Sequence, residues 1–88
     1  MIIGHVIGSV WATRKDERLN GLKLLVVKPK YSEGVDSSFV AADLASAGVG
    51  DDVLVTKGSS ARTAFGKERI PIDSVIVGVI DSIDITDE

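Results

Sequence analysis

The sequence contains no cysteine and only one histidine. Without cysteine, the chain has no disulfide and no thiolate to offer a metal ion. A single histidine also argues against a dedicated metal cage, so we expect no cofactor. A chain of 88 residues often relies on such supports, or on oligomerisation, for its stability. Oligomerisation is the support that this composition leaves available.

Basic residues are also in short supply, and long apolar runs are missing. Ten Lys and Arg stand against thirteen Asp and Glu, a net charge of −3, whereas contacts to nucleic-acid phosphates need a basic face. No run of about 18 apolar residues could span a membrane. The first dozen residues lack the basic start and apolar block of a signal peptide. We therefore expect a soluble cytoplasmic protein with no nucleic-acid or membrane partner.

Aromatic residues and proline are scarce, and many of the apolar residues are β-branched. Aromatics make up 5% of the chain and apolar residues 44%, including 12 Val and 9 Ile. Branching at Cβ favours strands over helices, which excludes a helical bundle. The length fits one domain over residues 1–88. The composition thus predicts an all-β or mainly β domain.

Apolar segments bounded by turn signals predict five strands, over residues 2–13, 22–29, 39–43, 53–57 and 73–85. One short helix is predicted over 61–65, with Ser59 or Ser60 as its N-cap and Gly66 at its end. The polar segment 30–38 is expected to be a mobile loop. Five strands rich in Val and Ile would leave exposed edges in an open sheet, so a small closed or nearly closed barrel is expected.

The first and last predicted strands are apolar on both faces. In the last one, Val75, Val77 and Val79 alternate with Ile76 and Ile80. A strand of this kind is covered on both sides. Since so small a domain has little helix to provide the cover, a second subunit is a natural candidate.

The residues that could carry chemistry form no recognisable catalytic or binding motif. His5 lies mid-strand with nothing to arrange a catalytic triad around it, so a packed or interface role is the alternative to catalysis. A small anion at Ser59 and Ser60, helped by Arg62, is one interpretation of the 58–62 turn. A capped turn is the other. Trp11 suits base stacking in an OB-type cleft, but the acidic balance and lack of other aromatics argue against it.

Four stretches, in order along nearly the whole chain, carry a family resemblance: 6–13 with Lys15, 19–27, 40–62 and 71–81. Within them, G-S-S-A-R at 58–62 and the P-x-D…G-x-I-D ending at 71–81 are the most specific. On these residues the chain resembles the EutN/CcmL family, the pentameric vertex proteins of bacterial microcompartment shells. It departs from the family at Ser46, where glycine is common, and in the variable loop 30–38.

The resemblance implies an OB-like five-stranded β-barrel that assembles as a cyclic homopentamer. It also implies a structural role rather than an enzymatic one, closing the vertices of a cytoplasmic polyhedral shell otherwise built from hexameric or pseudohexameric shell proteins. Cyclic symmetry requires a heterologous contact between two different patches. This agrees with the two apolar faces found by alternation, although the number five comes from the family alone.

The resemblance further suggests two glycine-containing stretches as the subunit contact or the axial opening: Ala47, Gly48, Val49, Gly50, Gly58, Ser59, Ser60, Ala61 and Arg62. Glycine suits such places because backbone can approach backbone there. Ordinary loops and a capped turn are the alternative. The competing functions are an OB-type binding module, which would be monomeric with a basic aromatic groove, and an enzyme that uses His5.

Overall fold

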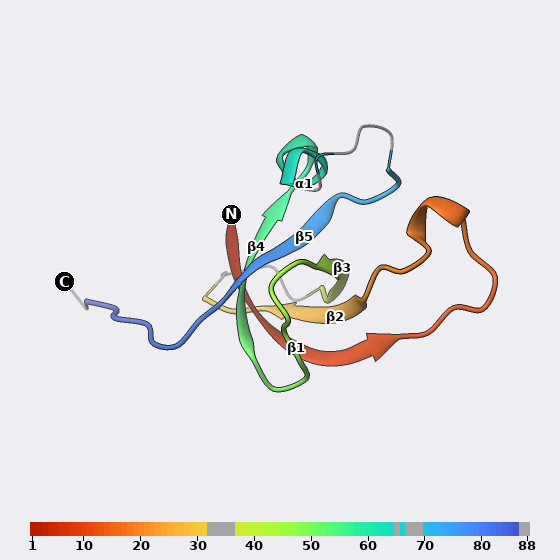
Figure 1. Cartoon of the computed structure of the whole chain (residues 1–88). Coiled ribbons are helices and arrows are strands. Elements are labelled where there is room, and N and C mark those ends of the chain that lie inside the picture. Colours follow the sequence, from red (N-terminus) through yellow and green to blue (C-terminus); the bar gives the residue numbers. More distant parts are fainter. Residues whose placement is uncertain (32–36, 65, 67–69, 87–88) are drawn as a thin grey trace.

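The computed structural model describes residues 1–31, 37–64, 66 and 70–86 (Figure 1). Its elements are β1 (Ile2–Val10), the 3-10 helix η1 (Glu17–Leu19), β2 (Leu24–Pro29), β3 (Phe39–Asp43), β4 (Asp52–Lys57), α1 (Ser59–Ala64) and β5 (Ser74–Val79). The fold is mainly β, with one short helix between the fourth and fifth strands, as predicted.

The five strands close into a barrel in the order β1-β2-β3-β5-β4. Neighbouring strands are antiparallel except β3 and β5, which pair in parallel at Ala42↔Val75 and Asp43↔Ile76. Closure gives each strand two neighbours over at least part of its length, so no strand is a free edge along its whole length. The predicted OB-like barrel is therefore confirmed.

The barrel is filled by small and branched apolar side chains from all five strands and from the loop after β3. These are Val6, Leu25, Val27, Ala41, Ala47, Val53, Val55 and Ile76, each at most 1% exposed. Burial of one Val, Leu or Ile side chain contributes about 1.5–3 kcal/mol. This interior is the part of the fold that alternation in the sequence predicts best.

A second apolar cluster lies outside the barrel, against β3 and β5. It consists of Ala42, Ala61, Ile70, Ile72 and Val75, with Leu19, Leu22 and Leu24 packed at its margin. Helix α1 and the segment before β5 thus cover the outward-facing Val75 from within the same chain. A neighbouring subunit is not needed there. Val77, further along β5, is 38% exposed and keeps an uncovered outer face.

The first and last strands are shorter than predicted. β1 ends at Val10, not residue 13, because its partner β2 begins at Leu24, which pairs with Val10. β5 ends at Val79, not residue 85, because β4 begins at Asp52 and offers no ladder beyond it. Residues 80–86 consequently leave the barrel as a tail (Figure 1).

Other local predictions have mixed outcomes. Helix α1 begins at Ser59 rather than at residue 61, so the predicted serine cap is wrong: both serines lie within the helix. The 3-10 turn η1 was not predicted. Most of the polar loop expected over 30–38, and Phe65 at the predicted end of the helix, lie outside the described residues.

Candidate functional site

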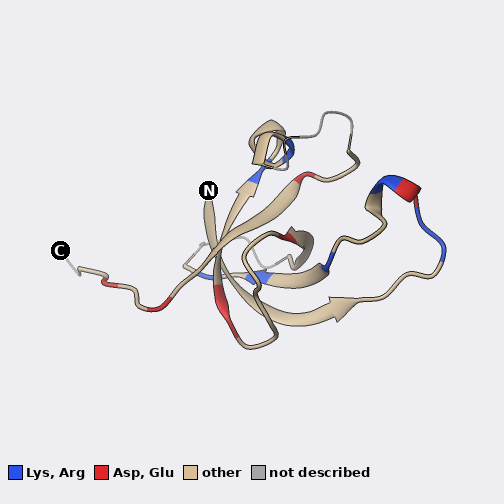
Figure 2. Ribbon diagram, in the orientation of Figure 1, with Lys and Arg blue, Asp and Glu red and all other residues tan. Residues whose placement is uncertain are grey.

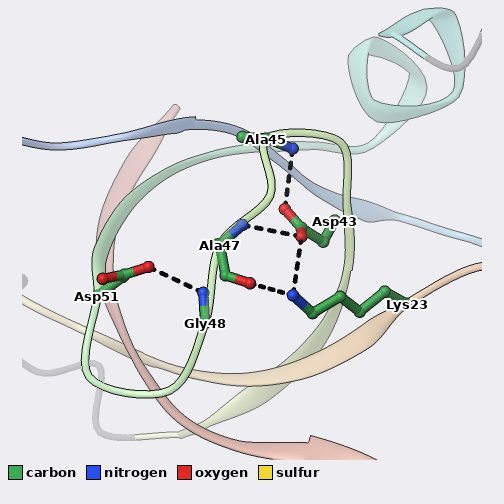
Figure 3. Close-up of polar contacts among 6 residues, drawn as sticks. All are labelled: Lys23, Asp43, Ala45, Ala47, Gly48 and Asp51. Atoms are coloured by element: carbon green, nitrogen blue, oxygen red, sulfur yellow. Dashed lines mark hydrogen bonds and ion pairs between the residues drawn. The ribbon is translucent and has the colours of Figure 1, made fainter.

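The loop between β3 and β4, which holds one of the two predicted stretches, is organised by the carboxylate of Asp43. One Asp43 oxygen accepts the Ala45 N–H and the other accepts the Ala47 N–H, both at 2.9 Å (Figure 3). Lys23 Nζ lies 3.6 Å from Asp43 Oδ2 and donates to the Ala47 carbonyl oxygen. The Asp43 side chain is only 2% exposed. A buried charge of this kind needs these partners, and they fix the course of the loop.

The second half of the loop is tied to Asp51 and to β1. Asp51 Oδ2 accepts the Gly48 N–H at 2.8 Å (Figure 3). Gly50 donates to the Val6 carbonyl oxygen, and the Val6 N–H donates to the Asp51 carbonyl oxygen, both at 2.9 Å. Between these anchors Val49 lies at the tip of the loop, 65% exposed. The loop therefore presents an apolar side chain to solvent from a held backbone.

Two residues of this loop have left-handed backbone. Gly50 has φ of 96° and Ser46 has φ of 57°. Glycine adopts this region without steric cost, whereas other residues are disfavoured there. Ser46 therefore holds a backbone conformation that a glycine would adopt without steric cost.

A groove of about 580 Å³ lies beside the loop tip. Its walls come from the end of β1, the start of β2 and the loop tip, and they include Trp11, Leu22 and Val49. Trp11 is 92% exposed. Lys15 and Lys23 also line the groove, and none of the other described residues that line it is charged. This groove was not predicted, because its residues come from segments distant in the chain, although the single tryptophan, Trp11, was a signal for it.

The second predicted stretch forms the turn into α1. Gly58 has φ of 67°, and its N–H donates to the Asp73 carbonyl oxygen at 2.8 Å. Ser59 and Ser60 are exposed, and Arg62 is half-buried. Arg62 forms no ion pair within the described part of the chain. A helix of six residues gives little dipole support to a bound anion.

The two predicted stretches lie apart. Helix α1 packs against β4 and β5, whereas the β3–β4 loop lies at the opposite end of the barrel (Figure 1). Ala47 and Ala61 fill the chain's own cores, and the exposed members are Val49, Gly50, Gly58, Ser59 and Ser60. Gly48 and Val49 also line the groove. Whether these residues contact a neighbour stays a prediction.

His5 belongs to a polar cluster on the outside of the barrel. Its Nδ1 lies 2.7 Å from Asp52 Oδ1, and Lys30 Nζ donates to Asp52 Oδ2 at 3.0 Å. These two hydrogen bonds, that from His5 foremost, hold the pKa of the Asp52 carboxyl below its usual range. No serine hydroxyl is bonded to His5 among the described residues, so the ring has the partners of a surface ion pair.

The described residues contain no cluster of three or more His, Cys, Asp or Glu able to hold a metal ion. None of their helices is long and apolar enough to cross a membrane.

Comparison with known proteins relates this geometry to one family. The family model described as ethanolamine utilisation protein EutN/carboxysome (EutN/CcmL) matches residues 1–81. The bacterial microcompartment shell vertex protein GrpN of Rhodospirillum rubrum is 42% identical over 86 residues, 96% of this chain and 97% of that protein. The carboxysome shell vertex protein CcmL of Nostoc is 42% identical over 91 residues, 99% of this chain and 89% of that protein.

Solved structures similar to this chain belong to the same family of shell proteins. The GrpN pentameric microcompartment shell protein superimposes with a TM-score of 0.84 at 39% identity, covering 98% of this chain and 100% of that one. The structure of Gloeobacter violaceus CcmL gives a TM-score of 0.86 at 36% identity, covering 97% and 90%.

Proposed function

We propose a cyclic homopentamer as the working form of this chain, which belongs to the EutN/CcmL family and is a structural vertex protein of bacterial microcompartment shells. The family is structural and the chain is not an enzyme. The observation that carries the pentamer is the match, over nearly the whole of both chains, to a shell protein described as pentameric. In this proposal residues 1–88 form one domain, repeated five times around an axis.

The outer surface of the barrel supports assembly independently of the match. Trp11, Val49 and Val77 are 92%, 65% and 38% exposed in the single chain. Large exposed apolar side chains beside a groove are typical of interaction surfaces. A cyclic ring covers them by a heterologous contact, in which one patch of each copy meets a different patch of the next.

The proposed partners of the pentamer are hexameric or pseudohexameric microcompartment shell proteins. A flat sheet of hexagonal tiles cannot close on itself, and five-fold units at the corners supply the missing curvature. The exposed members of the two predicted stretches, such as Val49 and Ser59, are candidates for the contact between subunits or for the axial opening.

Shell closure tests this function. The chain is co-expressed with hexagonal shell proteins, and the particles are imaged by electron microscopy with and without it. We expect closed polyhedra when the chain is present, and open sheets, tubes or particles with missing corners when it is absent. Equal closure in both samples would overturn the vertex function.

A further inference from the structure

Beyond Ile80, the tail over residues 80–86 has no strand partner among the residues that the structure describes. The Ile80 N–H donates to the Asp52 carbonyl oxygen at 2.8 Å, and no later described residue takes part in a backbone hydrogen bond that extends the sheet. The tail runs away from the barrel (Figure 1). In an extended conformation Ile83 and Ile85 share one face, and Ser82, Asp84 and Thr86 share the other. Ile85 is 59% exposed.

The groove beside Trp11 contains a strand edge without a strand partner. β4 pairs with β1 only over Ile2–His5, and Val6 bonds to the loop at Gly50 and Asp51. Beyond Val6, this edge of β1 has no strand partner within the described residues. An open edge beside an apolar groove is suited to an added extended segment, whose alternate side chains enter the groove.

Charge and position favour the same pairing. The tail carries Asp81 and Asp84, whereas the described residues that line the groove include two lysines and no acidic residue. Lys23 is already paired with Asp43. Lys15, which donates to the Ala12 carbonyl oxygen, is therefore the lysine available to the tail. Figure 2 shows acidic residues along the tail and a mixture of basic and acidic residues on the connection after β1, at opposite ends of the molecule. The tail and the groove lie at opposite ends of one chain, so the tail points away from the groove of its own chain. In a ring, the tail of one chain can reach the groove of the next chain.

From these observations we infer that the tail of each subunit lies in the Trp11 groove of the next subunit, along the open edge of β1, with Ile83 and Ile85 against Trp11 and Val49. The inference rests on the cyclic pentamer proposed above and identifies the contact between its adjacent subunits. The occupant is a second copy of this chain. Five such head-to-tail contacts close a ring, as heterologous interfaces do in cyclic symmetry.

Charged substitutions on the two faces of the tail test the inference in the full chain. The variant Ile83→Asp with Ile85→Asp places two charges on the apolar face. Its matched control, Ser82→Asp with Thr86→Asp, adds the same charge to the other face. Native mass spectrometry gives the oligomer, acrylamide quenching gives the exposure of Trp11, the chain's one tryptophan, and circular dichroism checks the fold.

We expect a shielded Trp11 in the wild-type pentamer and in the control. The apolar-face variant should stay folded, expose Trp11 and dissociate at a concentration at least about tenfold higher than the control does. The inference would be overturned if the apolar-face variant kept the oligomer mass and the Trp11 shielding of the wild type. It would also be overturned if both variants lost oligomer and Trp11 shielding to the same extent. A wild-type pentamer with a fully exposed Trp11 would overturn it too. A wild-type monomer would instead overturn the pentamer itself.

Cross-linking gives a second readout that does not depend on stability. Because the chain has no cysteine, Val49→Cys combined with Ile85→Cys introduces one defined pair. Oxidation of the pentamer should give a ladder of covalent oligomers up to five chains, and either single variant should give none. A pentamer of the double variant that forms only disulfides within one chain, or no disulfides, contradicts the tail exchange.

Discussion

The inside and the outside of this barrel are built from the same kinds of side chain, but only the inside is sealed by the chain itself. Val6, Val53 and Ile76 are completely buried, whereas Trp11 and Val49 are mostly exposed. The hydrophobic core is therefore complete within a single folded chain. The outer surface leaves apolar area uncovered, and that area is what a ring of copies can bury.

The difference between the buried and the exposed face is tested most strongly by placing the same charge on each side of β5. Ile76→Asp buries an unpaired carboxylate in the core and should cost at least about 4 kcal/mol, a large share of the stability of a small domain. We expect it to unfold the chain, as measured by circular dichroism and thermal unfolding. Val77→Asp, on the adjacent exposed position, should leave a folded chain that forms smaller species.

Native mass spectrometry separates these outcomes. If both variants were folded and of wild-type size, the division of β5 into a core face and a contact face would be wrong.

The network beneath the exposed loop tip tests how the outer surface is held in place. Asp43→Asn keeps the shape of the side chain but turns an amide group toward a backbone donor and removes the charge beside Lys23. We expect a loss of about 3 kcal/mol in the free energy of unfolding, together with weaker assembly, because the loop that carries Val49 loosens. Chemical denaturation measures the first effect and native mass the second.

Asp51→Asn is the matched control, since Asp51 is half-buried and its side chain holds a single N–H, that of Gly48. A loss as large as that of Asp43→Asn would contradict the view that burial of the carboxylate sets the cost.

Two glycines on β1 compare the tightness of the barrel at two points. A methyl group at Gly4 would collide with Val27 Cγ1 and come within 3.3 Å of the Lys28 carbonyl oxygen, whereas at Gly8 the nearest atom is Val26 Cβ at 3.9 Å. Gly4→Ala should therefore cost about 2 kcal/mol through overpacking. Gly8→Ala should stay within about 0.5 kcal/mol of wild type.

Urea unfolding of the two variants measures the difference. Equal free energies of unfolding would show that the barrel accommodates both methyl groups.

The smallest effect is expected from the polar cluster on the outer surface. Because His5 and Lys30 lower the pKa of Asp52 in the folded chain, the ionised carboxylate stabilises the fold above the unfolded pKa of about 4. This stabilisation is lost as the pH falls through the lower, folded pKa. The melting temperature of Asp52→Asn should therefore fall less on acidification than the melting temperature of the wild type.

Thermal unfolding at neutral and at acid pH gives the comparison, with Glu17→Gln, at an exposed position of η1, as control. An identical acid dependence in wild type and Asp52→Asn would exclude a contribution from this cluster.

The sequence predicted the strands well because alternation records which side chains face the barrel interior, as with Val53 and Val55. Strand ends were predicted less well, since a ladder ends where its partner ends: β5 stops at Val79 because β4 begins at Asp52. The pairing of Asp43 with Lys23 and the groove at Trp11 depend on contacts between distant segments, which one sequence does not reveal. The two predicted stretches lie at separate ends of the molecule, 47–50 in the β3–β4 loop and 58–62 at the start of α1, and their contact with a neighbouring subunit stays a prediction.

Native mass spectrometry of the purified wild-type chain, over a wide range of concentration, shows whether copies of the chain cover the apolar outer surface. We expect one dominant species of five times the 9.3 kDa chain mass, which dissociates only on strong dilution. A chain that stays monomeric at high concentration, with its apolar outer surface in water, would contradict this expectation.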